Sequence, residues 1–166
     1  MKTLVTYVSW TGNTRKVAGA IFDELEGEKE MRPLSEVRSL EGYGLVFVGF
    51  PIHDLGQPAP EAAEFLSRHA RGRRLALFVT HAAVEWFPLV GAWLANCQRA
   101  AAGAEILGVF NCQGELSQDE IDRMNASPDP RLHEWAQRAL GSKGQPDGTR
   151  LARARDFARE TWKAAF

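Results

Sequence analysis

Two adjoining pieces of sequence, Leu4-Val5-Thr6-Tyr7-Val8 and Ser9-Trp10-Thr11-Gly12-Asn13-Thr14, decide the fold prediction. The first piece is typical of a buried strand, and residues 14–25 then repeat apolar side chains at helical spacing. The hexapeptide therefore lies where a helix presents unpaired N–H groups and the positive end of its dipole. Because it adds three hydroxyls and a glycine to that junction, it predicts a phosphate site.

Helix capping is the alternative role for Ser9, Thr11 and Thr14. One cap needs only one such residue, so three around Gly12 favour phosphate ligands. The loop contains no lysine, which suits a phosphate monoester better than a triphosphate. The sequence lacks the nucleotide triphosphatase loop G-x-x-x-x-G-K-[ST], and the dinucleotide fingerprint G-x-G-x-x-G is missing at this turn. The acids of a phosphoacceptor domain and the Cys and Arg of a cysteine phosphatase are also missing there.

In the rest of the chain, apolar runs typical of strands alternate with apolar residues at helical spacing. Apolar runs typical of strands occur at residues 45–50, 75–79 and 105–112, with a weaker run at 31–34. Helical spacing occurs at residues 58–70, 88–101 and 151–166. Such alternation predicts βαβ units, and hence an α/β domain spanning residues 1–166 with a parallel sheet and helices on both faces.

The hexapeptide resembles the [ST]-x-T-G-x-T phosphate loop of flavodoxins, which are FMN-binding electron carriers. Residues 49–58, GFPIHDLGQP, resemble the loop that this family places after its third strand, against the flavin ring. Residues 42–49 resemble that third strand, and the likeness spans residues 1 to about 109 before it resumes in the last helix. The resemblance implies FMN as cofactor and a doubly wound, three-layer flavodoxin-like fold with a five-stranded parallel sheet in the order 2-1-3-4-5.

The resemblance also implies which residues contact the cofactor. The phosphate is expected against Ser9, Trp10, Thr11, Gly12, Asn13 and Thr14. The ring is expected between the loops after the third and fourth strands, from which we expect Pro51, Ile52, His53, Asp54, Leu55, Gly56, Thr80, His81, Ala82, Ala83 and Trp86 to contribute. We expect no catalytic side chain and no metal ligand.

Two features depart from the family pattern. Flavodoxins usually stack aromatic side chains from both loops on the ring, whereas the first loop here offers only His53 and the second offers Trp86 as the better stacking candidate. Trp10 either packs on a neighbouring loop or contacts FMN or a partner, and His81 fits a hydrogen-bonded loop residue better than a proton donor. The second departure is charge, because flavodoxin carriers are typically strongly acidic and this chain has a net charge of −1.

Composition excludes several other classes of protein. Hydrophobic residues make up 45% and charged residues 25%, which is ordinary for a soluble globular chain and argues against disorder. The near-zero charge argues against a nucleic-acid partner, and no apolar run approaches the roughly 18 residues of a membrane span. Cys97 and Cys112 form neither a disulfide framework nor a zinc motif. With no secretory pattern in the first residues, we expect a cytoplasmic protein.

Residues 113–148 interrupt the regular alternation between the fifth strand and the last helix. Residues 117–125 and 130–140 predict two short helices there, separated by turn signals. Residues 113–134 carry six acids and two bases, a local charge of −4, on the ligand side of the sheet. We expect this segment to flank the site and to select a redox partner or narrow substrate access.

Three functions remain open from the sequence. The first is an FMN-binding redox protein, a monomer or homodimer, that exchanges electrons with a protein partner. The second is an FMN-dependent NAD(P)H oxidoreductase acting on a small acceptor, and the third is a flavodoxin-like binding domain without cofactor.

Overall fold

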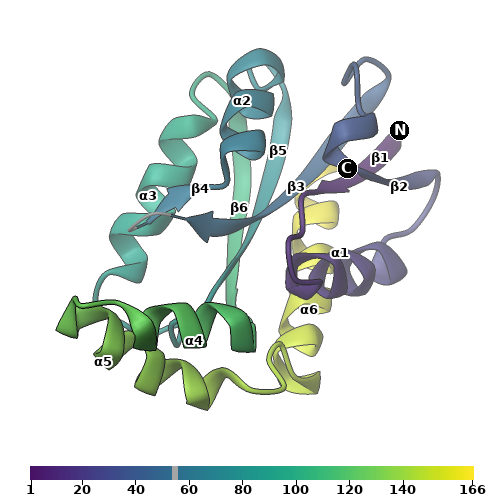
Figure 1. Cartoon of the computed structure of the whole chain (residues 1–166). Coiled ribbons are helices and arrows are strands. Elements are labelled where there is room, and N and C mark those ends of the chain that lie inside the picture. Colours follow the sequence, from purple (N-terminus) through teal and green to yellow (C-terminus); the bar gives the residue numbers. More distant parts are fainter. Residues whose placement is uncertain (54–55) are drawn as a thin grey trace.

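A parallel sheet with two helices on each face forms the centre of the structure, a computed structural model that describes residues 1–53 and 56–166 (Figure 1). The strand order is β2-β1-β3-β5-β6, which confirms the predicted doubly wound order 2-1-3-4-5. The strands of this path are β1 (Lys2–Tyr7), β2 (Lys29–Pro33), β3 (Tyr43–His53), β5 (Arg74–His81) and β6 (Glu105–Gln113).

The strand count is six rather than the predicted five. β3 continues three residues past its expected end at Phe50, and Gly56, with φ 102°, lies in the left-handed region that favours glycine. The chain then returns so that β4 (Gln57–Pro58) pairs antiparallel with Ile52 and His53. A side chain at position 56 would also meet Trp93, since an added Cβ would lie 1.9 Å from Cδ1 of that ring.

Successive strand residues point to opposite faces and build two separate cores. On one face, Val5, Phe47 and Phe78 pack under helices α1 (Asn13–Glu24) and α6 (Gly148–Ala165). On the other face, Leu4, Val48 and Leu77 pack under α2 (Pro60–His69) and α3 (Val90–Ala100). This two-sided burial explains the nearly continuous apolar runs of the central strands.

The segment between β6 and α6 forms the two predicted helices, α4 (Gln118–Ala126) and α5 (Pro130–Ala139), followed by the short helix η2 (Leu140–Ser142). α4 begins with a capping box, in which Ser117 and Glu120 each bind the other's backbone N–H. In Figure 1 both helices lie beyond the ends of β5 and β6, where ligands bind in doubly wound sheets.

The connection between β2 and β3 contains no α-helix. Only the three-residue helix η1 (Leu34–Glu36) and a short loop join these two parallel strands. A helix usually makes such a crossover. Here the sheet beside α2 is covered only by η1 and this loop.

Across the described residues, no helix has the length and apolar character needed to cross a membrane. The same residues contain no group of three or more His, Cys, Asp or Glu that could hold a metal ion.

Candidate cofactor site

The loop between β1 and α1 presents free N–H groups at a helix N-terminus. Gly12 has φ 93°, and the Ser9 hydroxyl accepts hydrogen bonds from the backbone N–H groups of Gly12, at 3.1 Å, and Arg15, at 3.2 Å. Ser9 thus holds the turn in shape. The N–H groups of Thr11, Asn13 and Thr14 have no acceptor among the described residues, so they can bind an anion.

The remaining side chains of this loop are already oriented by contacts. Oγ1 of Thr14 lies 2.9 Å from Oγ1 of Thr80, and both residues are buried. When Thr80 donates in this pair, the hydroxyl proton of Thr14 is available to an anion. Asn13 donates from Nδ2 to Oγ1 of Thr11 and, at 2.8 Å, to the carbonyl of Glu115. The loop is therefore fastened to β5 and to the segment after β6.

A slit of about 110 Å³ brings most of the predicted site residues together. Its walls come from the ends of β3 and β5, from residues 9–14, and from the segment after β6 with the first turn of α4. The predicted residues that line it are Trp10, Thr11, Asn13, Thr14, Pro51, Ile52, Thr80, His81 and Ala82. The sequence did not predict four of the lining residues, Gly114, Glu115, Leu116 and Glu120. The unusual length of the segment that contains them was the feature that could have indicated a role at the site.

The other predicted residues that the structure describes lie outside the slit. Ser9 and Gly12 face a neighbouring groove, while Gly56 and Ala83 are buried. His53 packs edge-on against Trp10, with ring centroids 5.7 Å apart, and Trp86 is 78% exposed. The stacking of His53 or Trp86 on a ring stays a prediction. Asp54 and Leu55 lie outside the described residues.

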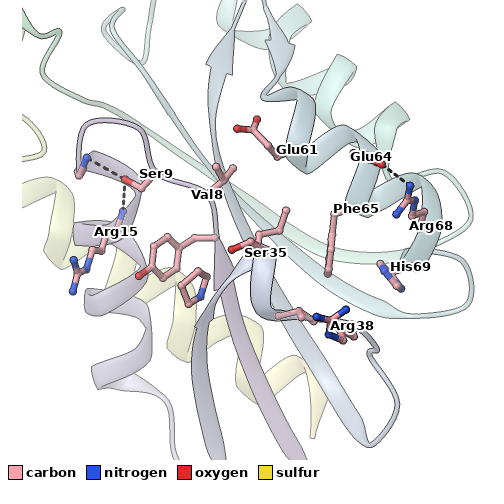
Figure 2. A pocket seen from close by; sticks show the side chains of 15 residues that line it. Val8, Ser9, Arg15, Ser35, Arg38, Glu61, Glu64, Phe65, Arg68 and His69 are labelled. Carbon is pink, nitrogen blue, oxygen red and sulfur yellow. Dashed lines mark hydrogen bonds and ion pairs between the residues drawn. The ribbon is translucent and has the colours of Figure 1, made fainter.

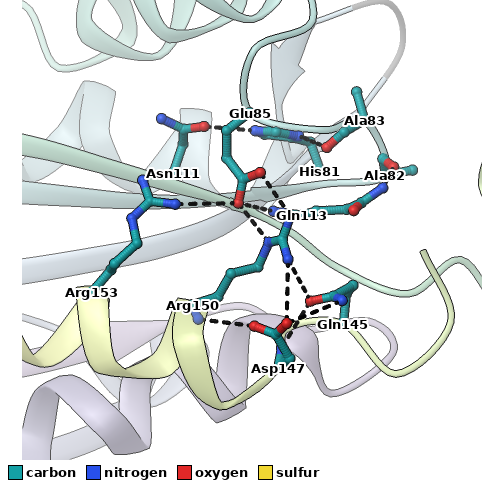
Figure 3. Close-up of polar contacts among 10 residues, drawn as sticks. All are labelled: His81, Ala82, Ala83, Glu85, Asn111, Gln113, Gln145, Asp147, Arg150 and Arg153. Carbon is teal, nitrogen blue, oxygen red and sulfur yellow. Dashed lines mark hydrogen bonds and ion pairs between the residues drawn. The ribbon is translucent and has the colours of Figure 1, made fainter. Parts of the chain in front are cut away.

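An ion pair of low exposure fastens the loop after β5. Arg150 of α6 binds both carboxylate oxygens of Glu85, with Nε to Oε1 at 2.6 Å and Nη2 to Oε2 at 2.8 Å (Figure 3). The Glu85 and Arg150 side chains are only 11% and 14% exposed, and Arg153 lies 3.6 Å from the same carboxylate. Burial raises the pKa of Glu85, but the hydrogen bonds from Arg150 and from backbone N–H groups, together with the positive charge of Arg150, outweigh it and hold this pKa below its usual value.

Two more side chains hold backbone carbonyls of the same loop. Gln113 donates from Nε2 to the carbonyl of Ala82 at 2.8 Å, and Nδ1 of His81 lies 2.8 Å from the carbonyl of Ala83 (Figure 3). Nε2 of His81 lies 3.0 Å from Oδ1 of Asn111. Burial lowers the pKa of His81, although its contacts with Asn111 and Ala83 raise it, and this favours a neutral ring in which one ring nitrogen donates.

The two cysteines do not supply a reactive thiolate. Burial raises the pKa of both Cys97 and Cys112 to about 12. Both thiols therefore stay protonated near neutral pH.

A groove of about 950 Å³ lies between η1 and α2, where the β2–β3 crossover has no helix (Figure 2). It shares no lining residue with the slit. Val8 and Phe65 give it apolar surface, and charged side chains such as Arg15, Arg38 and Glu61 stand along it.

An apolar pocket of about 260 Å³ adjoins the slit. It shares Ala82 and Leu116 with the slit, and Phe87 and Trp135 form an edge-to-face pair in its wall, with centroids 5.2 Å apart. Arg138 is its charged lining residue, with the guanidinium carbon about 6 Å from both rings. The segment between β6 and α6 thus builds one wall of this pocket.

Comparisons with known proteins identify relatives of the whole chain. The sequence model of the flavodoxin domain matches residues 4–159. A curated relative, the flavodoxin-like domain-containing protein BilS of Clostridioides difficile (strain CD3), is 29% identical over 169 residues, which cover 96% of this chain and 95% of that protein.

Solved structures share the fold at low sequence identity. A flavodoxin from the domain Archaea aligns with a TM-score of 0.63 and 15% identity, over 99% of each chain. Flavodoxin 1 from Bacillus cereus aligns with a TM-score of 0.58 and 17% identity, over 98% of each chain. A flavoprotein in complex with FMN from Lactobacillus acidophilus NCFM aligns with a TM-score of 0.53 and 23% identity, over 74% of this chain and 97% of that one. With the family match spanning nearly its whole length, this chain belongs to the flavodoxin family.

Proposed function

We propose that this protein binds FMN and exchanges electrons with a protein partner. The observation that carries the proposal is the set of three N–H groups, at Thr11, Asn13 and Thr14, that have no acceptor in the described part of the chain and stand beside a slit at the carboxyl ends of the strands. A phosphate monoester fits these neutral donors and the helix dipole. The structural neighbour described as a complex with FMN supports the choice of flavin.

In this proposal the chain holds FMN at two ends. The phosphate lies on the loop of residues 9–14, and the ring lies between Pro51 and Ile52 on one side and Thr80 to Ala82 on the other. The slit is smaller than the roughly 300 Å³ at which small-molecule pockets begin, so it accommodates the ring only with its walls further apart. Bound FMN supplies the redox chemistry, while these residues bind and orient it.

The test is the visible spectrum of the purified protein, followed by denaturation and identification of the released flavin. We expect a yellow protein, or a colourless one that takes up one FMN per chain. A protein that stays colourless with added FMN would instead support a flavodoxin-like domain without cofactor.

The apolar pocket favours a second candidate function, an FMN-dependent NAD(P)H oxidoreductase acting on a small acceptor. A pocket of about 260 Å³ that shares Ala82 and Leu116 with the slit could hold a planar apolar acceptor next to the ring. Oxidation of NAD(P)H by the isolated holoprotein, stimulated by a quinone, would favour this candidate. Reduction only in the presence of a protein donor would favour the electron carrier.

A further inference from the structure

We propose that the Glu85–Arg150 ion pair is a positioning device that fixes the loop of residues 82–85, whose first residue, Ala82, lines the slit at the proposed flavin-ring site. The proposal rests on the proposed FMN function and adds to it the residues that shape the ring end of the site. Glu85 and Arg150 hold the loop in place without lining the slit themselves.

The loop needs such support because it has no regular secondary structure. Residues 82–89 form bends and turns between β5 and α3, and Ala82, which follows His81 at the end of β5, is the one residue of this stretch that lines the slit. A loop that packs on a ligand loses conformational entropy on binding unless other contacts already order it. That loss of entropy weakens binding.

Gln113 and Arg150 supply the contacts that hold this loop. The Gln113 side chain binds the Ala82 carbonyl, and the backbone N–H of Gln113 donates to Oε1 of Glu85 at 3.3 Å. Gln113 therefore joins the ring-facing end of the loop to its charged end, and Arg150 joins the charged end to α6 (Figure 3).

Arg150 is itself held in position from the other side. Nη1 donates to Oε1 of Gln145 at 2.9 Å and lies 3.6 Å from Oδ2 of Asp147. Asp147 also accepts from the backbone N–H of Arg150 and so caps α6. The guanidinium therefore has a fixed geometry, and its bidentate contact orients the carboxylate of Glu85.

The rival explanation is a through-space effect of charge on the flavin. It predicts opposite results for the two neutral variants, since Glu85→Gln removes a negative charge and Arg150→Gln removes a positive one. Positioning predicts the same result for both, because either variant releases the loop. The effect should also be equal for FMN and riboflavin, since the ring end does not contact the phosphate.

The experiment measures dissociation constants of FMN and riboflavin for wild type, Glu85→Gln, Arg150→Gln and Gln113→Met. We expect both charge variants to weaken both flavins by about tenfold, and Gln113→Met, which loses one neutral hydrogen bond, by about threefold. The matched control is Glu24→Gln, which breaks an ion pair between α1 and Arg159 of the same helix α6, and should leave both constants unchanged.

Hydrogen–deuterium exchange of the amides of residues 82–86 in the apoproteins gives a second readout without cofactor. We expect faster exchange there in all three loop variants and unchanged exchange in Glu24→Gln. If a single charge variant fails to fold, the double variant Glu85→Gln with Arg150→Gln carries the test, because it removes the ion pair and leaves neither charge without its partner.

Opposite changes in affinity for Glu85→Gln and Arg150→Gln, or wild-type affinity and exchange in all three variants, would overturn the positioning role. Failure of the wild type to bind FMN would instead overturn the proposed function itself.

Discussion

The two ends of the site are built in different ways. At the phosphate end, Ser9 Oγ binds backbone groups three and six positions along the chain. At the ring end, Glu85 is bound by Gln113, 28 positions away, and by Arg150, 65 positions away. The first end is therefore a local turn at a helix N-terminus, whereas the second depends on strands and helices from the whole fold.

Because of this difference, we expect the two ends to contribute differently to flavin binding and to protein stability. In the proposed site the phosphate end supplies donors for one charged group of the ligand, so changes there should alter the preference for a phosphorylated flavin. The ring end depends on long-range contacts, so changes there should alter protein stability and the affinity for any flavin.

The largest effect is expected at the phosphate end. Replacing Thr11 and Thr14 together by Ala should raise the dissociation constant for FMN by at least about 100-fold. The reason is that a hydrogen bond to a charged phosphate contributes more binding free energy than a hydrogen bond between neutral groups. Calorimetric titration measures the constant, and riboflavin, which has no phosphate, serves as control in the same variant. Unchanged FMN affinity would mean that these hydroxyls serve only the turn and the contact to Thr80.

The next effect concerns stability at the ring end. Arg150→Gln leaves the carboxylate of Glu85 partly buried without its main partner, and should lower the free energy of unfolding by about 3 kcal/mol. Arg159→Gln breaks the more exposed pair with Glu24 and should lower it by less than about 1 kcal/mol. Urea unfolding of both variants measures the difference, and equal losses would show that Glu85–Arg150 is an ordinary surface pair.

A smaller effect is expected from the acidic surface of α4. Glu120 belongs to the capping box and should be left in place, so the variant to make is Asp119→Asn with Asp122→Asn. If a basic partner approaches this surface, electron exchange should slow about threefold at low salt, with a shallower dependence on salt. Stopped-flow flavin reduction across a salt series measures both rates and slopes. Superimposable rates and slopes for variant and wild type would remove α4 from the docking surface.

The smallest effect is a pH dependence of stability at His81. Its pKa is lowered in the folded protein, so the unfolded chain binds the proton more readily. The contribution of His81 is fully present above its unfolded value near 6.5, and is lost as the pH falls from there through the folded pKa. Urea unfolding between pH 5 and 7 should therefore show a steeper loss for wild type than for His81→Gln. Parallel curves would mean that another group causes the loss.

The same contrast explains what the sequence could predict. The strand order and the helices α4 and α5 follow from local periodicity and turn residues, and one contiguous motif predicts the turn between β1 and α1. β4 was missed because two residues, Gln57 and Pro58, are too few to give a strand pattern. The Glu85–Arg150 pair was missed because no local pattern joins residues 65 positions apart.

The residues that line the slit show the same limit on prediction from the sequence. Gly114 approaches Asn13 so closely that an added Cβ would lie 2.6 Å from Nδ2, yet the two residues are joined only by the folded sheet. The sequence identified their segment by its length and charge, but not the residues that face the cofactor site.

Paired titrations of the wild-type apoprotein with FMN and with riboflavin measure directly how much the phosphate contributes to binding. If the free N–H groups of Thr11, Asn13 and Thr14 bind the phosphate, FMN should bind at least about 100-fold more tightly than riboflavin. Equal dissociation constants for the two flavins would contradict the assignment of residues 9–14 as a phosphate site.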